Sequence, residues 1–189
     1  MDNLKQMILQ HGVVLSNETL QLDALLNHQV EPRLIMDIGK QFADRFRESG
    51  VTKVLTIESS GITVAFATAL ELGVPLVFAR RKKTLTTDGD VWAERVPSFT
   101  KGIVTDILVA KSVLRDTDNV VLIDDIIANG DAARGLIRIV DRAGARLAGV
   151  GVVVEKSFQA GARTIREQGI RFESIVRIKS LANGKVEFE

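Results

Sequence analysis

The segment from Val120 to Ala133 holds the residues of this sequence that are best placed to do chemistry. It reads VVLIDDIIANGDAA: an apolar run, two adjacent acids, a short turn and the start of a helical pattern. Ligands of parallel α/β sheets bind at the carboxyl ends of strands, where Asp124 and Asp125 are expected. A helix N-terminus offers free N–H groups and partial positive charge, and Gly130 lets the backbone approach an anion closely. The segment therefore predicts a phosphate site beside two carboxylates.

Asp124 and Asp125 also have a simpler interpretation. Acids are frequent at strand ends, where they form a polar terminus and cap the next helix. Two consecutive carboxylates repel each other, however, and a sugar diol or a metal ion would relieve that cost. The apolar run before the acids and the turn and helix behind them favour ligand binding.

Elements of alternating type surround this segment and must position it. Short apolar stretches predict strands at 51–57, 74–79, 120–123, 147–154 and 172–178. Apolar spacing and the glycines that follow predict helices at 2–11, 32–49, 62–72, 131–143 and 160–168. Residues 13–27 are ambiguous, because 20–24 alternate as in a strand while Leu25 and Leu26 break the alternation. The pattern indicates an α/β protein with a mainly parallel sheet flanked by helices.

The stretch from Arg80 to Lys101 departs from this rhythm. It is polar and has no clear period. Such a stretch inside a compact domain is typical of a functional or disordered loop, so we expect a flexible loop over 80–101. Residues 103–109 are expected either to rejoin the sheet or to form a hairpin with part of this loop.

Composition narrows the class of protein. The 189 residues fit one globular domain, 1–189, with 46% hydrophobic and 26% charged residues. A net charge of +1 gives no basic surplus for nonspecific nucleic-acid binding, and the absence of cysteine excludes disulfides and thiolate chemistry. The apolar runs are too short to span a membrane, and residues 1–10 are not a signal peptide. We therefore expect a cytoplasmic protein.

The segment 120–133 resembles the phosphoribosyl-diphosphate signature of type I phosphoribosyltransferases, a hydrophobic run followed by two acids and a small-residue phosphate loop. The whole chain is similar to the bacterial xanthine phosphoribosyltransferase family. Further stretches that carry this likeness are LQLDALLNHQ (20–29), TIESSGI (56–62), VFARRKKT (77–84), PSFTK (97–101) and VEKSFQ (154–159). The resemblance implies the type I phosphoribosyltransferase fold, with residues 1–31 forming a small hood over the base, and a homodimer.

The resemblance also implies a reaction, the transfer of phosphoribose from phosphoribosyl diphosphate to xanthine with release of diphosphate. Displacement at the anomeric carbon has oxocarbenium character, so the protein must stabilise a positive ribose and a negative leaving group. Asp124 and Asp125 match the catalytic pair that holds the ribose hydroxyls. The loop that wraps the 5′-phosphate corresponds to Ala128, Asn129, Gly130, Asp131 and Ala132. Mg²⁺ is implied as a bridge between diphosphate and ribose, without direct side-chain ligands.

The resemblance also implies that two further stretches bind the diphosphate. Ser59, Ser60 and Gly61 lie between a strand and a helix, where backbone N–H groups can receive an anion, although Ser-Ser-Gly is also an ordinary turn. Arg80 and Lys83 belong to a basic cluster suited to the same anion, with a solvated charged face as the alternative. Residues 84–97 resemble a mobile flap that shields the transition state from water.

Base recognition is implied at Leu20, Asn27 and Lys156. An ammonium group after the strand 147–154 can donate to an exocyclic oxygen, which favours an oxopurine over adenine. Without the resemblance, Lys156 would be read as a surface residue, Leu20 as core and Asn27 as a turn residue.

Asp131 is unexpected, because a carboxylate inside a phosphate loop repels the phosphate. An acid in the first helical turn can instead serve the helix dipole. We therefore predict that Asp131 faces away from the phosphate.

Three other functions compete with this interpretation. A sensor of phosphoribosyl diphosphate could keep the same fold, but no helix-turn-helix domain fits ahead of the first strand. A phosphoribosyltransferase for guanine, hypoxanthine or adenine is a closer rival. A Rossmann nucleotide-binding protein would need a Gly-x-Gly-x-x-Gly turn, which the sequence lacks.

Overall fold

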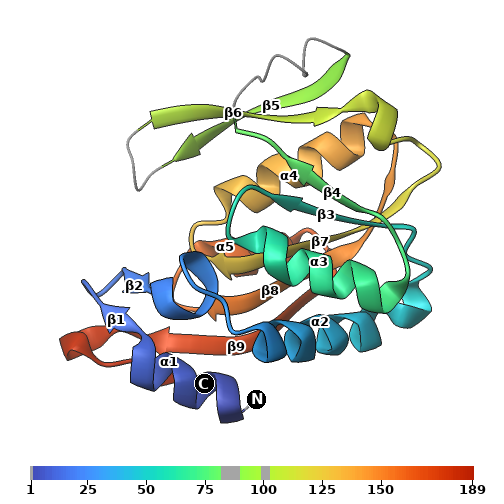
Figure 1. The fold of residues 1–189 in the computed structure, drawn as a ribbon. Helices are drawn as coiled ribbons and strands as arrows, with labels where there is room; N and C mark the ends of the chain where they lie inside the picture. Colours follow the sequence, from blue (N-terminus) through green and yellow to red (C-terminus); the bar gives the residue numbers. More distant parts are fainter. Residues whose placement is uncertain (1, 82–89, 99–102) are drawn as a thin grey trace.

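The computed structural model describes residues 2–81, 90–98 and 103–189, and its main feature is a six-stranded sheet (Figure 1). The strand order is β10-β9-β8-β7-β3-β4. The strands are β3 (Lys53–Ile57), β4 (Leu76–Ala79), β7 (Asn119–Ile127), β8 (Arg146–Lys156), β9 (Phe172–Ser180) and β10 (Glu187–Phe188). Neighbours from β4 to β9 pair in parallel, and β10 pairs antiparallel with β9. The predicted α/β class with a mainly parallel sheet is confirmed.

Helices cover both faces of this sheet. Figure 1 shows α2 (Pro32–Phe46) and α3 (Gly61–Leu72) in front of it, with α4 (Asp131–Arg142) and α5 (Ala160–Glu167) behind. Each face has its own apolar core: Phe42 and Phe46 belong to the first, Leu136 and Ile139 to the second. Because both faces are buried, the strands between them read as continuous apolar runs in the sequence. Short 3₁₀ turns lie at Arg47–Ser49, Lys111–Val113 and Ala182–Gly184.

The N-terminal segment, residues 2–31, packs at the edge of the sheet that β9 and β10 form. It contains α1 (Asp2–His11), β1 (Val13–Val14), β2 (Leu20–Gln21) and a π-helical turn at Asp23–Asn27. The ambiguous stretch 13–27 is thus part hairpin and part helical turn. The segment meets the end of the chain, since Lys5 Nζ donates to the Glu189 carbonyl at 3.1 Å and lies 5.2 Å from the centre of the Phe188 ring.

A separate two-stranded hairpin lies beside α4. Strands β5 (Val91–Ser98) and β6 (Ile103–Ala110) pair antiparallel, and an isolated bridge joins Arg80 to Leu108. Of the two alternatives for 103–109, the hairpin is correct. The expected flexible loop 80–101 is wrong over 91–98, which form β5, because pairing with β6 supplies the backbone partners that this polar stretch needs. Residues 82–89 and 99–102, which include Lys83 and residues 84–89 of the expected flap, lie outside the described residues.

Two strands run further than the sequence predicts. β7 continues through both acids to Ile127, and β8 continues to Lys156. The two strands hold each other in place, since Asp124 pairs with Val152 and Ile127 pairs with Glu155. Such ladders override the low strand preference of acidic residues. Among the helices that the structure describes, none is long and apolar enough to cross a membrane.

Candidate active site

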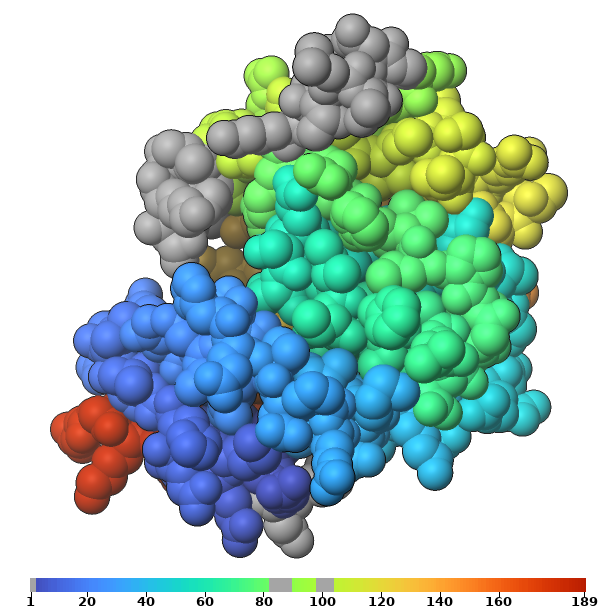
Figure 2. All heavy atoms as spheres, viewed as in Figure 1, coloured from blue at the N-terminus to red at the C-terminus, as the bar shows by residue number. Residues whose placement is uncertain are grey.

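Asp124 and Asp125 lie where two cavities approach each other at the carboxyl end of β7. The first, of about 190 Å³, is lined by Asp124, Arg81 and the loop 128–132. The second, of about 460 Å³, is lined by Asp125, Ser60 and part of the N-terminal segment. Ile126 lines both. We name them the loop cavity and the N-terminal cavity. Figure 2 shows the N-terminal segment (blue) beside α3 (green), with a hollow where the two approach.

The loop 128–132 is held tightly against the start of α5. Gly130 has φ of 79°, a left-handed conformation that glycine adopts without strain, and it caps α4. The Gly161 N–H donates to the Ala128 carbonyl at 3.0 Å. A methyl group on Gly130 would lie 2.8 Å from Gly161 Cα, and one on Gly161 would lie 2.4 Å from the Ala128 oxygen. Glycine is therefore required on both sides of this contact.

Asp131 is among the residues that line the loop cavity, and its orientation relative to a bound phosphate stays a prediction. The charge of its carboxylate is balanced, because Arg134 donates to Asp131 Oδ1 at 2.6 Å. Arg134 also donates to the Asn129 carbonyl at 2.7 Å and to Thr164 Oγ1 at 3.2 Å. The sequence analysis missed Arg134, although its spacing of three residues from Asp131 is that of a helical ion pair.

The two acids repel each other at close range. Burial, together with the neighbouring Asp125, raises the pKa of Asp124 well above its usual value, while the charge of Arg81 opposes that rise. The Asp125 N–H donates to Asp124 Oδ1 at 3.0 Å. A positive charge beside Asp124 would therefore be bound strongly, since it relieves both burial and repulsion.

The turn between β3 and α3 carries Ser59, Ser60 and Gly61, with a cis peptide bond between Glu58 and Ser59. Ser60 lines the N-terminal cavity and makes no side-chain cap to α3. Glu58 ties the basic residues after β4 to this turn. Its carboxylate accepts from Arg80 Nε at 2.8 Å and from the Arg81 N–H at 2.5 Å, and Arg81 Nε donates to its carbonyl at 3.1 Å. Glu58 thus holds Arg81, which lines the loop cavity, next to the turn, whose Ser60 lines the N-terminal cavity.

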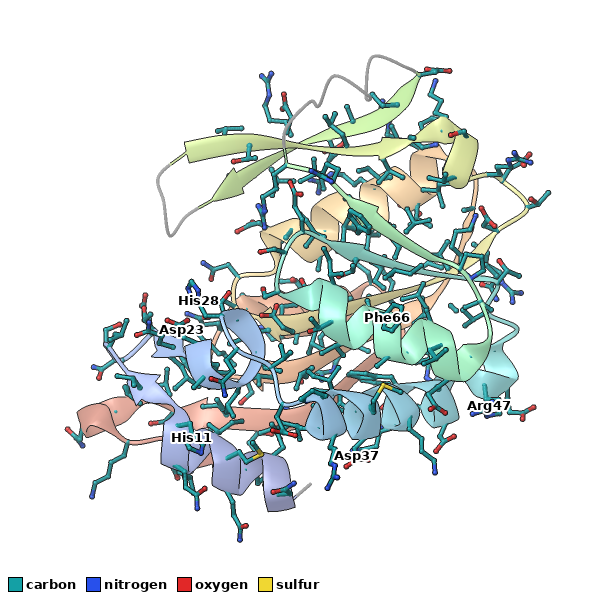
Figure 3. The ribbon with its side chains drawn as sticks, viewed as in Figure 1. His11, Asp23, His28, Asp37, Arg47 and Phe66 are labelled. Carbon is teal, nitrogen blue, oxygen red and sulfur yellow. The ribbon has the colours of Figure 1, made fainter. Side chains whose placement is uncertain are left out.

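Leu20 and Asn27 both line the N-terminal cavity. Leu20 is buried, and Asn27 Nδ2 donates to Asp23 Oδ1 at 2.9 Å. Hydrogen bonds from Asn27 and Gln21 hold the pKa of Asp23 below its usual value. His28, to which the sequence assigned no role, also lines this cavity; a lone histidine without a partner pattern gave no signal. Figure 3 shows Asp23 and His28 on the same part of the N-terminal segment.

Lys156 is buried, with 7% of its surface exposed, and is not the surface residue that its type alone would indicate. Its Nζ donates to the Glu18 carbonyl at 2.6 Å, which ties the end of β8 to the N-terminal segment. Burial lowers the pKa of Lys156. An ammonium group has three donors, so two remain for other acceptors.

Comparisons with known proteins fit this geometry. The profile of the phosphoribosyl transferase domain matches residues 22–176. A xanthine phosphoribosyltransferase of Moorella thermoacetica is 53% identical over 98% of this chain and 94% of its own, and one of Stutzerimonas stutzeri is 50% identical over 100% and 99%.

Solved structures agree on the fold. An adenine phosphoribosyltransferase of Giardia lamblia, complexed with 9-deazaadenine, has a TM-score of 0.73 at 25% identity, over 84% of this chain and 86% of its own. One of Rhodothermus marinus has a TM-score of 0.73 at 22% identity, over 93% and 100%. With a parallel sheet, paired acids on β7 and a glycine-capped loop at the start of α4, the chain belongs to the phosphoribosyltransferase family.

Proposed function

We propose that this enzyme transfers phosphoribose from phosphoribosyl diphosphate to xanthine, giving xanthosine 5′-monophosphate and diphosphate. The observation that carries the proposal is the placement of Asp124 and Asp125, which are adjacent in β7 but line different cavities. A ribose held by both acids has its 5′-phosphate on one side and its anomeric carbon on the other. The loop cavity then receives the phosphate and the N-terminal cavity receives the base.

The 5′-phosphate is bound by Ala128, Asn129, Gly130, Asp131 and Ala132. These residues precede and open α4, whose first N–H groups have no partner inside the helix. Arg134 neutralises Asp131, so the loop presents a helix N-terminus without an uncompensated carboxylate. The contact with Gly161 keeps the loop in one conformation, which lowers the entropy that phosphate binding costs.

The two acids bind the ribose hydroxyls and stabilise the positive charge that develops as the bond to diphosphate breaks. Burial and mutual repulsion make the ionised pair costly in the free enzyme. A cation beside the pair removes part of that cost. Because this charge exists in the transition state and not in the substrate, the interaction lowers the barrier rather than the KM.

The diphosphate is received by the backbone of Ser59, Ser60 and Gly61 and by Arg80; Lys83 is proposed for the same role. Mg²⁺, when bound with the substrate, would supply further charge neutralisation on the leaving group. The residues fit an ion that arrives with its substrate, because Asp124 and Asp125 are carboxylates that would attract such a cation. In the part of the chain that the structure describes, no three acidic or histidine side chains gather as a metal site.

The base is held by Leu20, Asn27 and Lys156, under a hood formed by residues 1–31. Leu20 supplies an apolar wall, and Lys156 supplies donors to an exocyclic oxygen. Adenine carries an amine at the exocyclic position and would leave such a donor unpaired, whereas xanthine carries oxygens. The relatives at about half identity carry the name xanthine phosphoribosyltransferase, which supports the same choice.

We further propose a homodimer in the cytoplasm, joined through the outer face of α3. Phe66 and Leu70 lie one turn apart on this face and are each 58% exposed, and Phe78 of the neighbouring β4 is 40% exposed. Figure 3 shows Phe66 pointing away from the sheet. Adjacent large apolar side chains on a surface are typical of a protein interface. Replacing Phe66 and Leu70 together by lysine should convert the dimer to a monomer in light scattering; a wild-type protein that is already monomeric contradicts the proposal.

The decisive experiment is steady-state transfer with xanthine, guanine, hypoxanthine and adenine, each with phosphoribosyl diphosphate and Mg²⁺. We expect the largest kcat/KM with xanthine. A preference for guanine or hypoxanthine would retain the role of Lys156 and change the substrate, whereas a preference for adenine would overturn that role. Binding of phosphoribosyl diphosphate without turnover of any base would favour a sensor.

The roles of the acids need their own test. Asp124→Asn combined with Asp125→Asn should abolish turnover and leave the circular dichroism spectrum unchanged. A double variant with wild-type turnover would refute the assignment. Asp44→Asn with Asp37→Asn, two exposed acids on α2, is the matched control.

A further inference from the structure

The hydroxyl of Thr56 is a buried polar group that the proposed function leaves unused. Thr56 lies in β3, its side chain is fully buried, and Oγ1 has no hydrogen-bond partner among the described residues. Thr68 of α3 is equally buried, but its hydroxyl donates to the Val64 carbonyl at 2.9 Å, as is usual for threonine in a helix. Local structure therefore explains the hydroxyl of Thr68 and does not explain that of Thr56.

The space that Thr56 Oγ1 faces is shared with Asp124. A methyl group built on Gly61 would lie 2.6 Å from Thr56 Oγ1 and 2.4 Å from Asp124 Oδ1. Both oxygens therefore border the same small space beside Gly61, the first residue of α3. Only glycine leaves that space open. Asp124 Oδ1 accepts the Asp125 N–H, and a carboxylate oxygen can accept a second donor.

We propose that Thr56 is a positioning residue, whose hydroxyl donates a hydrogen bond to Asp124 Oδ1 when the ribose is bound. The inference rests on the proposed role of Asp124 at the ribose. A carboxylate that holds two ribose hydroxyls must keep one rotamer, and the adjacent Asp125 N–H alone constrains it from the same strand. A donor from β3 fixes it from a second strand.

Two charged residues shift the pKa of Asp124, and both would remain if Thr56 were replaced. Asp125 on the same strand raises the pKa of Asp124, and Arg81 after β4 lowers it. A hydroxyl that donates to the ionised carboxylate acts in the same direction as Arg81. Removing the hydroxyl while Asp125 and Arg81 stay in place should therefore raise the pKa further. The acid limb of the pH profile of kcat should move to higher pH.

Thr56→Val and Thr56→Ala both remove the hydroxyl, and Thr56→Ser keeps it. For the valine and alanine variants we expect kcat to fall about tenfold, the loss of roughly one charged hydrogen bond, and KM for xanthine to stay unchanged. The acid limb should move up by about half a pH unit or more. Thr56→Ser should restore both. Because Thr56 Oγ1 has no partner in the free enzyme, Thr56→Val should not lower the melting temperature.

Thr68→Val is the matched control, which removes an equally buried hydroxyl whose hydrogen bond lies within α3. It should lower the melting temperature and leave kcat and the pH profile unchanged. A wild-type kcat and acid limb in both Thr56→Val and Thr56→Ala would overturn the proposal, as would a serine variant no better than alanine. Asp124→Asn distinguishes failure of the proposed function from failure of the Thr56 proposal. Full activity in that variant would refute the role of Asp124 at the ribose, independently of the results for Thr56.

Discussion

A methyl group at Gly161 is expected to displace the loop 128–132, which we propose binds the 5′-phosphate. Gly161 lies in the first turn of α5, and its Cβ would lie 2.4 Å from the Ala128 oxygen, 2.7 Å from the Gly130 nitrogen and 2.8 Å from the Asn129 carbonyl carbon. All three atoms belong to the backbone, so no side-chain rotation relieves the overlap. The loop and α5 must separate.

The size of the displacement follows from these contacts. Non-bonded carbon contacts are comfortable at about 3.5 Å, so the shortest contact requires a movement of about 1 Å. A misplacement of about 1 Å at a catalytic site costs roughly a hundredfold in rate. We therefore expect Gly161→Ala to raise the KM for phosphoribosyl diphosphate by about tenfold to a hundredfold, while KM for xanthine changes little. Overpacking should also cost about 1–3 kcal/mol of stability.

Gly39→Ala provides the matched control. Gly39 is also helical and buried, and its Cβ would lie 2.5 Å from Ala67 Cβ and 2.6 Å from the Ala67 carbonyl carbon, between α2 and α3. Kinetics and thermal melting should show a similar loss of melting temperature in both variants and a changed KM in Gly161→Ala alone. An unchanged KM for phosphoribosyl diphosphate in Gly161→Ala would refute the view that α5 positions the loop.

Three other variants test single interactions. Arg134→Met should expose the charge of Asp131 and raise the KM for phosphoribosyl diphosphate about tenfold, or about 1.4 kcal/mol, with recovery when Asp131→Asn is added; no recovery contradicts the charge argument. Asp124→Asn should raise the melting temperature at pH 7, because the native pKa lies above the unfolded one and ionisation destabilises the native state. That gain should shrink as the pH falls through the native pKa and Asp124 becomes protonated; a gain independent of pH would exclude ionisation as its cause. Lys156→Met should raise the KM for xanthine about tenfold and leave that for phosphoribosyl diphosphate unchanged, and equal effects on both would remove its role at the base.

The sequence predicted the helices and the parallel strands well, because the apolar pattern of each element lies within its own stretch of sequence. The end of β7 was placed too early, since Asp124 and Asp125 break that pattern while the ladder to β8 continues. The bounds of strand β5 were not predicted, for a related reason. Its polar residues gain their stability from pairing with β6, which no local window contains.

The candidate site was predicted in outline, and its supporting contacts were not. The acids and the turn at Gly130 stand together in the sequence, so their chemistry can be read directly. The contact of Gly130 with Gly161 joins residues 31 positions apart, and that of Lys156 with Glu18 joins residues 138 positions apart. Such contacts depend on how the strands are ordered, which composition and periodicity do not specify. Lys156 is the clearest case, because its burial follows from a segment at the other end of the chain.

The contact between Lys5 and Glu189 gives the N-terminal segment a distinct place in folding. It joins residues 184 positions apart, whereas β7 pairs with β3 and β8 over shorter separations, as in the pairs Val120 with Lys53 and Asn119 with Arg146. Contacts of large sequence separation form late, because the chain between them must first be ordered. The same segment should also open first, as a local unfolding unit, while β7 and the loop 128–132 stay folded. Amide hydrogens of α1 should therefore exchange faster than those of β7, and opening of this unit would give a bound base a way out that leaves the phosphate in place.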